Sequence, residues 1–277
     1  MTDQGERYDR IAEGYARWWA PVLAPSARTL LDRLDGTFDG RRARLLDVGS
    51  GTGTLTVAAL ERWPEIRVDS VDASDAMVEA TRAASGRVPS ARARFEATSA
   101  YADELPFPDG AFDAVVSSFV LQLVPNRHRA LREIRRVLRP GGRLAYVTWV
   151  RDSRPWRPDE ILDDVLDALG IGARDDDGYV APNAGDLPSA ESAAAGLRRA
   201  GFHGVTAEAG RLRHPFDPES YTGFIVEFDE QDLAESLEPD VRARLEADLR
   251  ARLSRLDPGE LVLESPIAYA TGRRPER

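Results

Sequence analysis

Short apolar segments alternate with longer segments whose apolar residues recur at helical spacing, from about residue 44 onward. The short segments predict buried strands, and the longer ones predict helices with one apolar face. Strands are expected at residues 44–48, 66–72, about 93–97, 112–119 and 144–149, and helices at 55–62, 75–84 and 127–138. Ser74 is placed to cap the second helix, and Pro140-Gly141-Gly142 predicts a sharp stop after the third. This alternation predicts an α/β fold, a parallel sheet covered on both faces.

The first predicted strand contains Asp47 near its end and leads into a turn with three glycines at alternate positions, Gly49, Gly51 and Gly53. A ligand can approach such a turn closely, because glycine has no Cβ and tolerates φ > 0. The start of the following helix also offers unpaired N–H groups to an anionic part of the ligand. A dinucleotide site would follow G-x-G-x-x-G/A, but Thr54 stands at the third glycine position. The turn therefore indicates another kind of cofactor site, where Asp47 suits a cationic group; a tight turn without a ligand is the alternative.

A second acidic position follows at the end of the next predicted strand, about 20 residues after the glycines. A carboxylate there can accept hydrogen bonds from both hydroxyls of a ribose. We assign this role to Asp72, because Asp69 lies earlier in the strand and Asp75 falls inside the next helix. A simple helix-entry residue is the alternative for Asp72. Met77, about one helical turn on, is a candidate contact for an adenine face or else a core residue.

Four stretches of the chain resemble one protein family. The run D-x-G-x-G-x-G at residues 47–53 closely resembles motif I of the class I S-adenosylmethionine-dependent methyltransferases. Residues 8–15 (YDRIAEGY), 103–116 (DELPFPDGAFDAVV) and 130–142 (ALREIRRVLRPGG) resemble the small-molecule branch, which includes ubiquinone- and menaquinone-type and many natural-product enzymes. The resemblance covers residues 8–150. It implies a seven-stranded, mostly parallel, Rossmann-like sheet with an antiparallel last strand, and S-adenosylmethionine as the cofactor.

The resemblance also implies roles for particular residues. Gly49 and Gly51 would lie under the methionine part of the cofactor, and Asp72 would bind its ribose. The Ser118 carbonyl would face the methionine ammonium, and Tyr8 would touch the carboxylate end. The full implied set is Tyr8, Asp47, Gly49, Ser50, Gly51, Asp72, Ala73, Met77, Tyr101, Ala102 and Ser118.

The adenine end departs from the family pattern. Members often carry an aspartate four residues before the leucine of L-P-F, but Tyr101 stands at that place. Either Asp103 binds the adenine amino group through a shifted loop, or Tyr101 stacks on the ring and the polar contact is lost. Ala102 would offer its backbone beside the adenine.

Segments outside the central sheet are predicted to cover this site. Residues 8–33 hold several closely spaced aromatic residues and are expected to form one or two helices over its mouth. After residue 150 we expect helices at 159–169, 190–200, 218–227 and 239–256, and strands at 204–213 and 261–272. Irregular stretches at about 151–187 and 214–258 are expected to be lids that select the substrate. The chain thus divides into N-terminal cap helices (1–40), a cofactor-binding core (41–150) and the rest of the same domain (151–277).

Composition removes several kinds of chemistry. The 277 residues include no cysteine and no lysine, which excludes disulfides, thiolate nucleophiles and a Schiff-base lysine. The net charge of −10 opposes nucleic-acid binding, and residues 117–120 (SSFV) lack the [DNS]-P-P-[FYW] element typical of enzymes that methylate base amino groups. No signal-peptide core is present, and no apolar stretch approaches the roughly 20 residues that span a bilayer. We therefore expect a cytoplasmic protein.

Methyl transfer from a sulfonium depends mainly on alignment and exclusion of water. A general base is needed only when the acceptor keeps its proton, as a hydroxyl or a carbon acid does. The candidate bases are His128, His203, His214, Tyr15, Tyr179 and Tyr221. His128 opens the helix after the fourth strand, although a solvated histidine at a helix start is the simpler interpretation, and His203 and His214 are interpreted as structural. We assign no catalytic base.

Aromatic residues gather in or beside the two late insertions, namely Trp149, Trp156, Phe216, Tyr221, Phe224 and Phe228. If several line one pocket, the acceptor is largely apolar; packing of a lid against the sheet is the alternative. We predict S-adenosylmethionine-dependent methyl transfer to a small organic acceptor, and leave the acceptor and the oligomeric state open. The alternatives are a non-methylating member of the fold, such as a cofactor-binding cyclase or binding protein, and a nicotinamide oxidoreductase, which Gly53 and Thr54 oppose.

Overall fold

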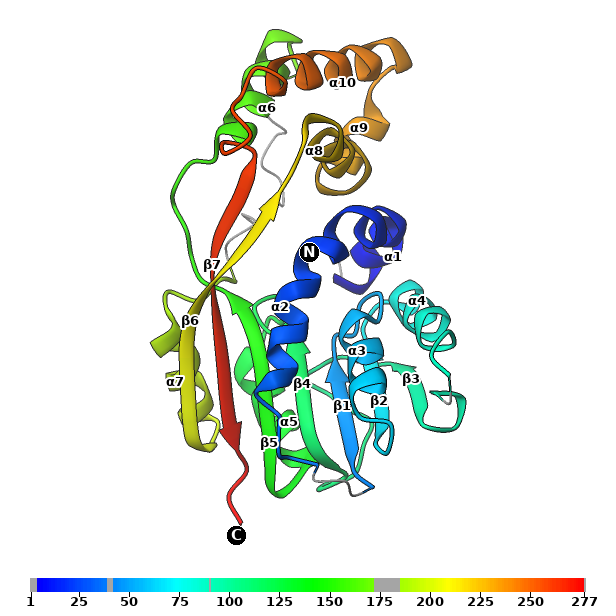
Figure 1. Cartoon of the computed structure of the whole chain (residues 1–277), viewed down its shortest axis with the longest axis vertical. Helices are drawn as coiled ribbons and strands as arrows, with labels where there is room; N and C mark the ends of the chain where they lie inside the picture. The colour runs from blue at the N-terminus through cyan, green and yellow to red at the C-terminus, as the bar shows by residue number, and fades with distance from the viewer. Residues whose placement is uncertain (1–3, 39–41, 90, 172–184, 277) are drawn as a thin grey trace.

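A seven-stranded sheet forms the base of the molecule in the computed structural model, which describes residues 4–38, 42–89, 91–171 and 185–276 (Figure 1). Its strands are β1 (Arg44–Val48), β2 (Arg67–Asp72), β3 (Phe95–Ser99), β4 (Phe112–Ser118), β5 (Leu138–Trp149), β6 (His203–Pro215) and β7 (Val262–Arg273). The strand order is β3-β2-β1-β4-β5-β7-β6. The first five strands pair in parallel, whereas β7 is antiparallel to both β5 and β6. The predicted fold class is confirmed.

Helices cover both faces of this sheet because its strands are apolar on both sides. Leu45 packs in a core with α2 (Ala20–Asp32) and α3 (Thr54–Arg62), and the next residue, Leu46, packs in a second core with α5 (Arg127–Val137) and α7 (Ala190–Arg199). Neighbouring residues of a strand point to opposite faces, so both leucines are fully buried. Helix α4 (Asp75–Ser85) follows β2 and begins at Ser74, whose hydroxyl accepts from the Met77 N–H at 3.1 Å as predicted.

Two predicted boundaries in the core were wrong. Strand β5 begins at Leu138, well before the predicted residue 144, and the Pro140-Gly141-Gly142 stretch belongs to the strand. Gly141 bends it with a φ of +73° while its N–H donates to the Arg274 carbonyl, so hydrogen bonding continues through the bend. Strand β3 begins at Phe95, two residues after the start of the strand predicted at about 93–97.

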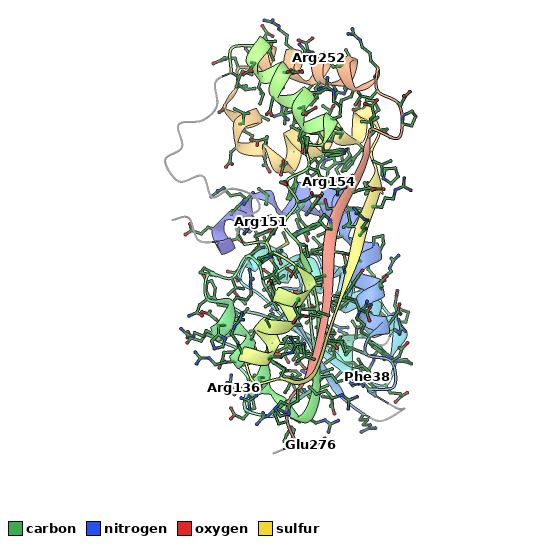
Figure 2. The ribbon with its side chains drawn as sticks, turned by 90° about the vertical axis from the view of Figure 1, so that its left-hand side faces the viewer. Phe38, Arg136, Arg151, Arg154, Arg252 and Glu276 are labelled. Carbon is green, nitrogen blue, oxygen red and sulfur yellow. The ribbon has the colours of Figure 1, made fainter. Side chains whose placement is uncertain are left out.

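A second layer of helices, here called the cap, stands above the carboxyl ends of the parallel strands. It consists of α6 (Arg157–Ala168), α8 (Pro218–Phe224), a π-helix (Ile225–Asp229), α9 (Gln231–Ser236) and α10 (Pro239–Leu253). The long β6–β7 ribbon connects it to the sheet (Figures 1 and 2). Leu245, Leu249 and Leu253 of α10 are buried, as their one-turn spacing predicted.

The N-terminal segment lies between the sheet and the cap. Helix α1 (Gln4–Gly14) leads into a second π-helix (Tyr15–Trp19) and then into α2. The two π-helices contact each other, and we call this contact the seam. Short π-helical turns are rare and occur frequently at functional sites. Among the helices that the structure describes, none is both long and apolar enough to cross a membrane.

Candidate active site

The glycine turn, residues 49–53, connects β1 to α3 at the carboxyl edge of the sheet. Gly49, Gly51 and Gly53 have φ values of +75°, +55° and +85°, a region that strains other residues. The N–H groups of Gly49 and Ser50 both donate to the Val71 carbonyl, at 2.8 and 3.1 Å. The turn is therefore fixed to the end of β2 by backbone hydrogen bonds.

The three glycines face different surroundings. A Cβ on Gly53 would lie 3.1 Å from the Thr81 Cα, so this glycine permits close packing against α4. A Cβ on Gly49 would lie 2.2 Å from a methyl of Val120, whose side chain covers this glycine. A Cβ on Gly51 would meet only the Tyr15 ring, with the hydroxyl oxygen at 3.7 Å. Gly51 is therefore the least crowded glycine of the turn, and the Tyr15 ring covers it at van der Waals distance.

Asp72 ends β2 beside Gly51. Its Oδ2 accepts from the Gly51 N–H at 2.8 Å, and its Oδ1 accepts from the Ser74 N–H at 3.0 Å. Burial raises the pKa of this carboxyl, although the backbone donors act in the opposite direction. Asp69 instead pairs with Arg44 at 2.9 Å, and Asp75 is exposed in the first turn of α4. Of the three acidic residues considered from the sequence, Asp72 is the one bonded to the glycine turn.

Asp47 is buried beneath the turn, with 1% of its surface exposed. Its Oδ2 accepts from the Thr56 hydroxyl at 2.6 Å, and that hydroxyl also lies 2.7 Å from the Ser70 hydroxyl. Its Oδ1 has no hydrogen-bond partner in the described structure. Burial raises the pKa of Asp47 to about 7, and the negative charge of Asp72 adds to that shift. A buried carboxylate oxygen without a partner is an unused acceptor for a cationic ligand group.

Two tyrosines from the N-terminal segment lie at this site, Tyr15 over Gly51 and Tyr8 beside Tyr15. The Tyr8 and Tyr15 rings meet edge to face with centroids 5.9 Å apart. Burial raises the pKa of both phenols, and the Asp72 charge raises them further. Both hydroxyls therefore stay protonated near neutral pH and are able to donate hydrogen bonds.

The end of β4 carries local backbone strain. Ser118 pairs with Val147 of β5, and the following residue, Phe119, has a φ of +55°. It is the one non-glycine residue with positive φ among those described. Its carbonyl accepts from the Gln122 side chain at 2.6 Å, and its ring lies 4.4 Å from that of Trp149. Such strained residues concentrate at ligand-binding sites, and this one directly follows the predicted Ser118 position.

The predicted adenine-binding residues lie along the edge formed by β3 and α4. Tyr101 is 49% exposed, and Ala102 is half-buried. Asp103 forms a 3.9 Å ion pair with Arg129 of α5. Met77 is buried to 1% exposure, and the Ala73 carbonyl lies against Gly5 of α1, where a Cβ would come within 2.7 Å. The stacking role of Tyr101 and the alternative role of Asp103 both stay predictions.

The candidate bases are scattered. His128 and His203 are exposed, whereas His214 packs against the Phe216 ring with its pKa lowered by burial. Tyr221 is buried and donates to Asp159 at 2.7 Å. Tyr179 lies outside the described residues. None of these contacts brings a histidine to the glycine turn.

Sequence reasoning missed Asp229, the last residue of the cap π-helix. Its side chain is exposed. Desolvation by nearby protein and the charges of Glu230 and Asp159 raise the pKa of Asp229, and the charge of Arg7 opposes the shift. No pattern in the sequence distinguishes this aspartate, because its neighbours come from α1 and α6.

Sequence reasoning also missed how closely the aromatic residues gather, and it left Trp19 out of the acceptor set. The Trp19 ring lies 5.2 Å from Phe224, 6.0 Å from Phe228 and 6.0 Å from Trp149. Phe228 also contacts Tyr15, at 5.7 Å. We call Trp19, Phe119, Trp149, Phe224 and Phe228 the aromatic wall. It connects the tips of β4 and β5 to the cap, and the rings of Trp19 and Trp149 are only half-buried.

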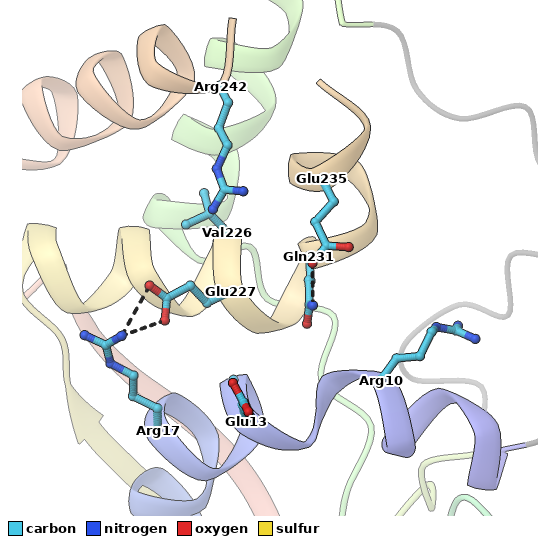
Figure 3. Close-up of a pocket in the computed structure, with 9 residues that line it drawn as sticks. Arg10, Glu13, Arg17, Val226, Glu227, Gln231, Glu235 and Arg242 are labelled. Atoms are coloured by element: carbon cyan, nitrogen blue, oxygen red, sulfur yellow. Dashed lines mark hydrogen bonds and ion pairs between the residues drawn. The ribbon is translucent and has the colours of Figure 1, made fainter. Parts of the chain in front are cut away.

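A polar cleft of about 290 Å³ opens on the outer side of the seam (Figure 3). Arg10, Glu13 and Arg17 line it from the N-terminal segment, and Glu227 and Glu235 line it from the cap. Its charges are mixed, and it lacks the apolar lining of an acceptor pocket.

Comparisons with known proteins show which family this chain is similar to. A family model described as a methyltransferase domain matches residues 46–146. The ubiquinone/menaquinone biosynthesis C-methyltransferase UbiE of Methylobacterium nodulans is 34% identical over 206 residues, covering 72% of this chain and 77% of the relative. The 27-O-demethylrifamycin SV methyltransferase of Amycolatopsis mediterranei is 33% identical, over 51% of this chain and 56% of the relative.

A solved structure shares the fold along nearly the whole chain. The [4+2]-cyclase SpnF superposes with a TM-score of 0.61 at 22% identity, covering 98% of this chain and 95% of that structure. At this identity the likeness concerns the fold alone. It includes the cap as well as the sheet.

Proposed function

The chain belongs to the class I S-adenosylmethionine-dependent methyltransferases, in the small-molecule branch, and we propose that its acceptor is a small, largely apolar molecule bound between the glycine turn and the cap. Its cofactor is S-adenosylmethionine. When bound, this cofactor supplies a methyl group activated by a positively charged sulfur. A cytoplasmic location stays a prediction.

Residues of the turn fit this cofactor in charge and in space. Only the Tyr15 ring lies above Gly51, and Asp72 offers a fixed carboxylate next to this glycine. We propose that Asp72 accepts hydrogen bonds from the ribose hydroxyls. The unpartnered Oδ1 of Asp47 supports a role for that residue toward the cationic end.

The remaining cofactor contacts are proposed from position. Tyr8 and Tyr15 are neutral donors suited to the methionine carboxylate, and the Ser118 carbonyl is suited to its ammonium. Tyr101 and Ala102 are proposed for the adenine, with Met77 behind them. Gly49, Ser50 and Ala73 complete the proposed set, although Val120 covers Gly49 and the N–H groups of Gly49 and Ser50 already donate to Val71.

The aromatic wall supports the nature of the acceptor. Half-buried indole rings offer apolar, flat surfaces to a ring-containing or otherwise apolar molecule. The wall also excludes water, which favours transfer by displacement at carbon.

The observation that carries this proposal is the hydrogen bond from the Gly51 N–H to Asp72, at the least crowded glycine of the turn. Radiolabelled S-adenosylmethionine should transfer its methyl group to members of a panel of quinols, phenols and macrolides, with S-adenosylhomocysteine released in equal amount. Binding of the cofactor without transfer to any extract or panel member would favour the non-methylating alternative. Binding of NADH but not of S-adenosylhomocysteine would contradict both.

A further inference from the structure

Asp9 of α1 helps to cap the N-terminus of another helix, α4. Its Oδ1 accepts from the Ser74 hydroxyl at 2.6 Å and from the Ala76 N–H at 3.0 Å, at the start of α4. These bonds lower the pKa of Asp9, so it stays charged at neutral pH. Ser74 uses the same hydroxyl to accept from Met77, so the two residues together cap α4.

Ser74, the N-cap residue of α4, is also bonded to the candidate ribose-binding carboxylate, Asp72. The Ser74 N–H donates to Asp72, and Asp72 in turn accepts from Gly51. Three consecutive hydrogen bonds therefore lead from Gly51 through Asp72 and Ser74 to Asp9. Each of them is between 2.6 and 3.0 Å long.

Helix α1 touches the core at one end and the cap at the other. At its start, Gly5 lies against the Ala73 carbonyl. At its end, Gly14 lies so close to the Glu227 carbonyl that a Cβ would come within 1.7 Å. Glu227 also accepts from the Trp18 indole N–H at 2.6 Å. The position of α1 therefore determines how the seam and its aromatic neighbours are placed.

We propose that Asp9 is a positioning residue that couples cofactor binding at Asp72 to the docking of α1, and through α1 to the cap. This inference rests on the proposed function. A ligand bonded to Asp72 fixes the carboxylate that holds Ser74, and Ser74 holds Asp9. By linkage, docked α1 must strengthen cofactor binding by the same factor by which the cofactor strengthens docking.

The test combines calorimetric titration with S-adenosylhomocysteine and hydrogen exchange of the α1 amides. In the wild-type protein, ligand should bind and slow exchange over Gln4–Gly14. Asp9→Ala should weaken binding about fivefold, the size expected for losing one capping interaction, and should remove the ligand-dependent slowing. Asp9→Asn keeps an acceptor oxygen and should stay within about twofold of wild type.

Glu6→Ala provides the matched control, because Glu6 is exposed on the same helix. It should bind and exchange like the wild type. Wild-type binding together with unchanged affinity and unchanged α1 protection in Asp9→Ala would overturn this inference alone. Absence of wild-type binding would overturn the proposed function and this inference with it.

Discussion

At the tip of the sheet the site is held by backbone hydrogen bonds and short polar side chains, whereas on the cap side it is held by aromatic rings from the N-terminal segment, two strand tips and the cap. The glycine turn uses atoms close in sequence, such as Gly49 bonded to the neighbouring strand. The aromatic wall joins Trp19 to Trp149 and Phe224 across the whole chain. The backbone of the glycine turn suits a single ligand, the cofactor. The side chains of the aromatic wall can be exchanged to suit another acceptor without disturbing that turn.

Changing Asp72 should have the largest effect, confined to the cofactor side. Asp72→Ala should weaken S-adenosylhomocysteine binding at least about 100-fold, because two charge-assisted hydrogen bonds are lost. Isothermal calorimetry measures the change, and circular dichroism checks that the fold persists. Asp75→Ala, which removes an exposed carboxylate in the next helix, is the control and should bind normally. Tight binding by Asp72→Ala would refute its ribose role.

A change in the aromatic wall should instead impair use of the acceptor and leave cofactor binding nearly unchanged. Trp19→Leu should lower kcat/KM for the acceptor about 10- to 50-fold, as expected for losing several aromatic contacts, with cofactor affinity within about threefold. The control is Trp63→Leu, because Trp63 packs against Phe38 away from the wall. Equal losses of acceptor efficiency in both variants would show that Trp19 acts only through stability.

The pH dependence of cofactor binding should report Asp47. Its pKa of about 7 means that the ligand-free protein holds a proton there at lower pH, which a cationic ligand must displace. Affinity should therefore fall as pH drops below 7, by up to about tenfold per unit. Calorimetry in buffers of different ionisation enthalpy would detect the released proton.

Asp47 should also affect the stability of the fold, with a pH dependence opposite to that of ligand affinity. Because its folded pKa lies above the ordinary value of an aspartate, its contribution to stability is greatest at low pH and declines as pH rises toward 7. Asp47→Asn should thus flatten the pH dependence of both ligand affinity and unfolding. A variant that keeps the wild-type pH profile would assign the effect to another group.

The smallest effect is expected at the surface of the seam. The Arg17–Glu227 ion pair is 3.0 Å long, but its side chains are 65% and 38% exposed. Arg17→Ala should change the free energy of unfolding by less than about 0.5 kcal/mol and leave turnover unchanged. A large loss of turnover would place part of the acceptor site in the outer cleft.

The helices and strands of the sheet region, on the cofactor side of the molecule, were predicted closely from sequence, whereas their contacts with the cofactor stay predictions. Strand β1, the start of α4 at Ser74 and the choice of Asp72 depend on local patterns, and the structure contains the predicted elements within a residue or two. The start of β5 was predicted wrongly, because a glycine bend that keeps its hydrogen bonds resembles a helix stop. Local signals were sufficient where the glycine turn and the strand ends belong to consecutive elements.

The acceptor half could not be predicted in the same way. Neither π-helix has a sequence signature, and residues 218–227 were predicted as one plain helix. Trp19, Asp9 and Asp229 acquire their surroundings from elements far away in the chain, so only the fold reveals them. The aromatic residues of the insertions were identified, but the gathering of Trp149, Phe224 and Phe228 around Trp19 was not.

A crystal structure with S-adenosylhomocysteine would show whether the glycine turn and Asp72 form the cofactor site. We expect the ligand beside Gly51, with both ribose hydroxyls within hydrogen-bond distance of Asp72 and its thioether sulfur facing the aromatic wall. An empty glycine turn at saturating ligand, or a ligand bound elsewhere on the chain, would contradict it.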